Sequence, residues 1–149
     1  MRRTSLAILV LVSVPVFVIA QSQPPRPTVV VYKKSTCGCC AKWVTHLRQH
    51  GFEVTSTDVA DLGVIKARHN VPPGLSTCHT ALVKGYVVEG HVPAEDVVLL
   101  LKDRPAVAGI AVPGMPIGSP GMEGGNPQAY DVVSFDKKGE VKIFSSHRP

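Results

Sequence analysis

Three of the four cysteines of this chain fall within four consecutive residues, as Cys37, Cys39 and Cys40. An apolar run at residues 29–32 precedes them, and residues 40–50 follow with an apolar stripe at helical spacing. This order predicts a short buried strand, a turn that carries the cysteines, and a helix that Gly51 closes. Unpaired backbone N–H groups and the positive end of the helix dipole lower the pKa of a thiol at a helix start. The clustered sulfurs are therefore predicted to be reactive.

The rest of the pattern predicts an α/β domain. We expect a strand at 52–57, a helix at 61–69 capped by Asp61, a break at 71–74, a hairpin at 80–83 and 86–89, a helix from Pro93 to Lys102, and a second hairpin at 130–135 and 140–144. Residues 109–128, with six glycines and four prolines, are expected to form one long loop. A cysteine turn between strand and helix, followed by a hairpin and another helix, is typical of a thioredoxin-like fold with a central mixed sheet.

The N-terminal segment reads as an export signal. Arg2 and Arg3 precede an apolar stretch at 6–19, and cleavage is expected near Ala20. The alternative is an uncleaved membrane anchor, but the stretch is short for a span and Pro15 interrupts it. Residues 21–28 are predicted to be a Pro-rich linker, and 29–149 the metal-binding domain. Export places the cysteines in an oxidising compartment.

Charge and composition argue against one class of partner. The formal net charge of the 149 residues is +5, and it falls to +3 without Arg2 and Arg3. That surplus is mild, and only 5% of the residues are aromatic, so a nucleic-acid surface is not expected. After signal cleavage the chain is not expected to associate with a membrane.

The cysteine spacing allows two kinds of chemistry. Cys37 and Cys40 can form a reversible disulfide across the first helical turn, or they can bind one metal ion together. Cys39 and Cys78 exceed what a dithiol exchanger needs, and several soft donors favour Cu(I) or Zn(II). The alternative is two structural disulfides, although the clustered cysteines are so close in sequence that at most one long-range bridge, to Cys78, could form.

Other donors come from segments expected near this turn. His79 adjoins Cys78, and His91 follows the first hairpin, so each is either a ligand or an ordinary loop histidine. Met115 and Met122 lie in the glycine-rich loop, away from any apolar stripe, and thioethers also suit Cu(I). His46 and His50 fit a solvated helix face better than a metal pair.

Several motifs, in order along the chain, resemble the CopG family of bacterial periplasmic copper-resistance proteins, long described as a domain of unknown function. They are residues 31–44 around the cysteine turn, 71–73, 76–81, 85–94 and 112–123. The resemblance covers residues 29–144. It implies a thioredoxin-like fold and copper handling in the periplasm, with Cys37, Cys39, Cys40 and Cys78 as the principal copper site and His79, His91, Met115 and Met122 as further ligands. Cys78 and His79 stand where thioredoxins commonly place a proline, which makes general disulfide exchange less favoured.

We therefore expect a periplasmic protein that holds Cu(I), as one ion or as several bridged by sulfur, and that cycles copper between Cu(I) and Cu(II). A copper efflux system or a periplasmic redox partner would then exchange copper or electrons with it. The alternative is a thiol-disulfide oxidoreductase in which Cys37 attacks and Cys40 resolves. A passive carrier that docks to an export pump is a third hypothesis, and the sequence does not decide whether the protein turns over as an enzyme.

Overall fold

The computed structural model describes residues 26–149, so the predicted signal peptide and most of the predicted linker lie outside the described residues. The elements are β1 (Thr28–Lys33), α1 (Gly38–Gln49), β2 (Glu53–Asp58), α2 (Leu62–Arg68), the 3₁₀ turn η1 (Pro73–Leu75), β3 (His79–Val83), β4 (Tyr86–Glu89), α3 (Ala94–Asp103), β5 (Gly109–Ala111), β6 (Tyr130–Phe135) and β7 (Val141–His147). They form the predicted mixed α/β fold.

All seven strands belong to one sheet in the order β2-β1-β3-β4-β5-β6-β7. Strand β1 runs parallel to β2 and antiparallel to β3, and β4 runs antiparallel to β3 and parallel to β5. Strands β6 and β7 extend the sheet as an antiparallel hairpin. Each parallel pair needs a crossover, which α1 supplies between β1 and β2 and α3 supplies between β4 and β5.

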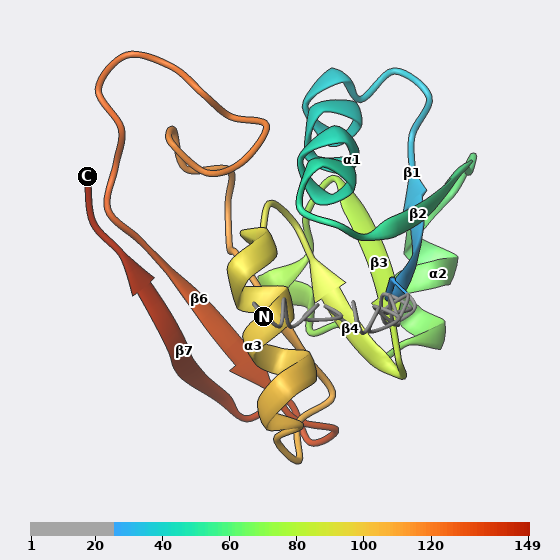
Figure 1. Cartoon of the computed structure of the whole chain (residues 1–149). Coiled ribbons are helices and arrows are strands. Elements are labelled where there is room, and N and C mark those ends of the chain that lie inside the picture. The colour runs from blue at the N-terminus through green and yellow to red at the C-terminus, as the bar shows by residue number, and fades with distance from the viewer. Residues whose placement is uncertain (1–25) are drawn as a thin grey trace, which may run out of the picture.

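Helices cover both faces of the sheet (Figure 1). Helices α1 and α3 lie on one face, where Trp43, Leu47 and Leu100 pack with inward-facing strand residues in the main core. A second cluster, which includes Leu75, Val87 and Phe135, fills the opposite face. Among the described residues, no helix is long and apolar enough to cross a membrane.

Most predicted elements are confirmed to within about two residues. Asp61 caps α2 by accepting a hydrogen bond from the Gly63 amide at 2.7 Å. The β3–β4 turn places Lys84 and Gly85 at φ 47° and 89°, and two such left-handed residues close a tight hairpin. Strand β7 runs three residues farther, to His147, than the predicted hairpin.

The predicted loop at 109–128 was wrong at its start, because β5 occupies its first three residues. Strand β5 pairs with β4 on one side and β6 on the other, so neighbouring strands rather than local periodicity hold it extended. A Cβ at Gly109 would collide with the Val87 carbonyl and lie 2.9 Å from the Phe135 ring. A glycine that reads locally as a loop residue here allows close strand pairing.

Candidate metal centre

The cysteines meet at one end of the sheet, beside the start of α1. Cys37 is the N-cap of α1, which begins at Gly38, two residues before the predicted start, so Cys39 and Cys40 lie in its first turn. Cys78 comes directly before β3, which pairs with β1 so that His79 stands opposite Lys33. Neighbouring strands thus bring together two segments that are 38 residues apart.

Two of the four sulfurs are joined. Cys37 and Cys40 form a disulfide, while Cys39 and Cys78 are free thiols. The Cys39 sulfur lies 3.5 Å from that of Cys37, and the Sγ atom of Cys40 lies 3.7 Å from the Cys78 carbonyl. All four sulfurs lie within 4.8 Å of one another. We call these four residues the thiolate group, since in reduced form they offer four soft donors to one small volume.

Cys78 also belongs to a second set of donors, with His79 and His91, which we call the imidazole group. Its ligand atoms again lie within 4.8 Å of one another. The Cys78 sulfur is 3.5 Å from Nε2 of His91 and 3.7 Å from Nδ1 of His79. Both histidines are fully buried. The structure therefore brings six of the eight predicted ligands together.

Hydrogen bonds define how the two imidazoles face this group. Nδ1 of His91 lies 2.7 Å from the Pro120 carbonyl, which can only accept, so Nδ1 carries the proton and Nε2 turns a lone pair toward Cys78. A backbone carbonyl commonly orients a metal-binding imidazole in this way. Nε2 of His79 is, among the described residues, the only buried side-chain nitrogen or oxygen without a hydrogen-bond partner. Nδ1 is the His79 nitrogen that lies near the Cys78 sulfur, so the unpartnered Nε2 atom is a cost of burial and not the donor of this group.

Burial sets the protonation of these groups. It lowers the pKa of His79 to about 3, with the neighbouring His91 and Lys66 adding to the effect. Burial likewise lowers the pKa of His91, so both imidazoles are neutral at pH 7, as metal binding requires. Burial first, and then the neighbouring Cys39, raises the pKa of the Cys78 thiol to about 12. A metal ion at this thiol would displace its proton.

The loop between β5 and β6 packs against the start of α1. Gly121 is buried there at φ 88°, and a Cβ on it would lie 2.7 Å from the Cys39 carbonyl and 3.2 Å from Nδ1 of His91. Met122 follows as a half-buried side chain, whereas Met115 is 50% exposed. The two methionines stay predicted ligands.

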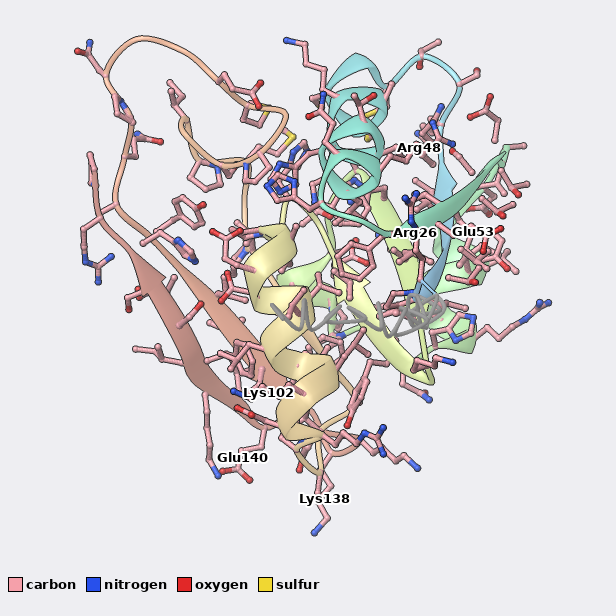
Figure 2. All side chains as sticks on the ribbon, in the orientation of Figure 1. Arg26, Arg48, Glu53, Lys102, Lys138 and Glu140 are labelled. Carbon is pink, nitrogen blue, oxygen red and sulfur yellow. A yellow bond between two sulfur atoms is a disulfide. The ribbon has the colours of Figure 1, made fainter. Side chains whose placement is uncertain are left out.

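A cavity of about 330 Å³ opens beside the sulfurs. Its lining includes Cys37 and Cys78 together with Lys34, Thr36 and Thr77. Cys37 of the disulfide and Cys78 therefore border a space that a small molecule or an ion can enter. The labelled side chains of Lys102, Lys138 and Glu140 lie at the opposite end of the molecule, where α3 and the β6–β7 hairpin turn end (Figure 2).

Sequence reasoning missed a buried polar network next to the site. Glu89, which is fully buried, binds Lys66, Thr77 and Thr80. The only sign of this network in the sequence is one acidic residue, Glu89, in an otherwise apolar strand. Its lysine partner is 23 residues away, so the sequence does not indicate the pairing. His46, predicted to be solvated, is half-buried and accepts a hydrogen bond from the Ala94 amide at 3.1 Å, at the start of α3. That bond occupies Nε2.

Comparison with known proteins agrees with this geometry. A family model described as a protein of unknown function, DUF411, matches residues 75–122, which include Cys78, His79 and His91. No curated protein matches the chain. A solved structure titled copper resistance protein CopG, form 1, is 41% identical with a TM-score of 0.79, covering 85% of this chain and all of that one. Form 2 is also 41% identical, with a TM-score of 0.78, covering 83% of this chain and 99% of that one. At this identity over nearly the whole of the matched chains, the protein belongs to the CopG family of copper resistance proteins.

Proposed function

We propose that the protein binds copper in the periplasm and serves copper resistance by holding Cu(I) in the thiolate group. The observation that carries this proposal is the meeting of four sulfurs within 4.8 Å at one helix start. Thiolates are the preferred ligands of Cu(I), and closely spaced sulfurs can bridge several ions. Relatives named for copper resistance support the choice of copper over zinc.

The donor set suits both oxidation states of copper. Reduced Cys37, Cys39, Cys40 and Cys78 supply soft sulfur, whereas His79 and His91 supply the nitrogen that Cu(II) accepts more readily. Met115 and Met122 would add thioether donors from the loop that packs against α1.

The Cys37–Cys40 pair offers a balanced redox step. When two thiols become one disulfide, they release two electrons and two protons. Two Cu(II) ions would take one electron each and become two Cu(I) ions, while the protons pass to solvent. The disulfide then needs two electrons from a periplasmic dithiol partner before the four-thiolate group can form again. An efflux system is the expected acceptor of the copper.

Substitution of the paired cysteines tests the site. We expect Cys37→Ser and Cys40→Ser each to reduce Cu(I) affinity by at least tenfold, because each removes one thiolate from a shared set. The measurement is an anaerobic titration of the reduced mature chain against a chromophoric Cu(I) chelator, with copper bound and thiols protected counted per chain. His50→Gln, at the exposed residue that follows α1, is the control. Wild-type affinity in both cysteine variants would reject the proposal.

A thiol-disulfide oxidoreductase remains the second candidate, and one observation favours it. The chain already holds the Cys37–Cys40 disulfide, and Cys37 lines a cavity. This function predicts that the reduced, metal-free protein reduces the disulfides of insulin and that Cys37→Ser abolishes this activity. An inert metal-free protein that binds Cu(I) tightly would remove this candidate.

A further inference from the structure

A buried network of Lys66, Thr77, Thr80 and Glu89 ties together the backbone segments that carry the imidazole group. Lys66 comes from α2, Thr77 from the segment before β3, Thr80 from β3 and Glu89 from the end of β4. Side chains alternate along a strand, so Thr80 lies on the α2 face of the sheet, whereas His79 faces Trp43 of α1. The Thr80 side of the network thus lies behind the ligands, on the other face of the sheet.

The Glu89 carboxylate is the hub of this network. Its Oε1 atom accepts hydrogen bonds from the Thr77 amide at 2.6 Å and the Thr77 hydroxyl at 2.8 Å, and it also contacts the Lys66 ammonium. Its Oε2 atom accepts from the Thr80 hydroxyl at 2.8 Å. Lys66 also donates to the Thr80 hydroxyl at 3.0 Å. The carboxylate therefore has partners on both oxygens, although it is shut off from solvent.

The two threonines flank the ligands in sequence. Thr77 comes directly before Cys78, and Thr80 directly follows His79. Glu89 itself stands opposite Thr80 in the β3–β4 ladder and two residues before His91. One carboxylate thus connects the chain on both sides of Cys78 and His79 to the strand end that leads into His91.

Stability alone does not account for such a pair. Burying two charges costs several kcal/mol per ion, and a well-packed apolar pair of similar volume often stabilises a fold as much or more. What a charged, hydrogen-bonded network adds is a restricted geometry, because its donors and acceptors must face one another. Here the network restricts the backbone next to three predicted ligands, Cys78, His79 and His91.

We propose that Glu89 is a positioning residue for the metal centre: neutralised by Lys66, it holds Thr77 and Thr80 and thereby fixes where Cys78 and His79 lie relative to His91. This inference rests on the copper-binding function proposed above. It assigns Glu89 no contact with copper. The Thr77 hydroxyl is the part of the network that a substitution can remove without changing any charge.

Two variants of Thr77 test the idea without adding or removing charge. Thr77→Val keeps the shape but removes the hydroxyl, and Thr77→Ser keeps the hydroxyl. Loss of groups that orient metal ligands typically costs about 10- to 100-fold in affinity. We therefore expect Thr77→Val and Glu89→Gln to weaken Cu(I) binding by about 10-fold or more. Thr77→Ser, which keeps the hydroxyl, should bind Cu(I) with the wild-type affinity. The assay is the anaerobic chelator competition on the reduced mature chain.

Asp96→Asn is the matched control, because Asp96 is also a buried acid paired with a base, His147, at 2.7 Å, but it contacts no ligand. It should lower the free energy of unfolding while leaving Cu(I) affinity unchanged. Wild-type Cu(I) affinity in both Thr77→Val and Glu89→Gln would overturn the proposal. An equal loss of affinity in Asp96→Asn would overturn it as well, since the effect would then follow from stability alone.

Amide hydrogen exchange of the metal-free protein separates this inference from the proposed function. If Glu89 holds the segment, exchange at residues 77–80 should accelerate in Glu89→Gln and Thr77→Val and not in Asp96→Asn. Unchanged exchange there overturns the positioning role. If the wild-type chain binds no Cu(I) but exchange still accelerates, the positioning of the segment is supported and the copper function fails. Should Glu89→Gln not fold, the Thr77 pair decides.

Discussion

At the scale of single residues, burial keeps three imidazoles neutral in the folded protein. Burial lowers the pKa of His46, and the nearby His50 lowers it further. The pKa values of His79 and His91 are lowered by burial as well. His46 needs its bare Nε2 atom to accept the Ala94 amide at the start of α3. Protonation of His46 would break its bond with the Ala94 amide, and protonation of His79 would place a charge where solvent does not reach it.

The metal-free protein should therefore lose stability as the pH falls below about 6.5. The unfolded chain takes up protons at its ordinary histidine pKa, whereas the folded chain does not until a lower pH is reached. Each such histidine then costs up to about 1.4 kcal/mol of unfolding free energy per pH unit. Urea unfolding between pH 7 and 5 measures this slope.

His46→Gln isolates one contribution to that slope, because a glutamine carbonyl can accept the Ala94 amide and does not titrate. We expect the slope to become shallower in His46→Gln than in the wild-type chain. An identical slope in wild type and His46→Gln would show that protonation of His46 does not couple to folding.

The sequence predicted a ligand only where the residue type, or its position next to another candidate, was enough to identify it. The cysteines stand out by type, and His79 and His91 by their closeness to Cys78 and to the hairpin. The Lys66–Glu89 pair could not be predicted, because it joins α2 to β4 across the sheet and depends on strand order. The disulfide state of Cys37 and Cys40 stayed open for a related reason, since their spacing serves both disulfide and metal.

At the scale of elements, the loop after β5 is positioned by backbone contacts with α1 and His91. Its Pro120 carbonyl holds His91, and Glu123 accepts the Gly121 amide at 2.6 Å. The sequence predicted a loop because glycine and proline hide periodicity. It could not predict where the loop packs. A glycine indicates that another backbone segment comes close, but it does not indicate which segment.

Gly121→Ala should displace this loop. The new Cβ would press on the Cys39 carbonyl at 2.7 Å and on the Trp43 amide at 3.0 Å, and the residue would also be strained at φ 88°. We expect a loss of about 2 to 3 kcal/mol in unfolding free energy. Gly114→Ala is the matched control, because Gly114 has φ 72° but nothing within 4 Å of a Cβ, and it should lose about 1 kcal/mol from strain alone. Equal losses would mean that the loop does not rest on α1.

At the scale of the whole molecule, the core rather than the disulfide holds the fold. The seven-stranded sheet packs two apolar clusters against its faces, with Trp43, Leu47 and Phe135 fully buried. The disulfide joins residues only three apart in sequence. Closing so short a loop removes little conformational freedom from the unfolded chain.

Reduction should accordingly leave the fold intact. We expect the unfolding free energy of the metal-free protein to fall by about 2 kcal/mol or less on reduction. Guanidinium unfolding with and without a phosphine reductant measures the difference, and far-UV circular dichroism checks that the helices and strands remain. Loss of the cooperative transition on reduction would contradict this and would leave no folded four-thiol state to receive copper.

Cys78 is a member of both donor groups, and this shared membership makes their occupancies interdependent. An ion in the thiolate group and an ion in the imidazole group must either share one sulfur or compete for it. In both cases the filling of one group changes the affinity of the other. The coupling free energy is reciprocal. An ion in the thiolate group changes the affinity of the imidazole group by the same factor as an ion in the imidazole group changes that of the thiolate group. Under the copper function proposed above, the binding isotherm should therefore differ from the sum of two independent sites.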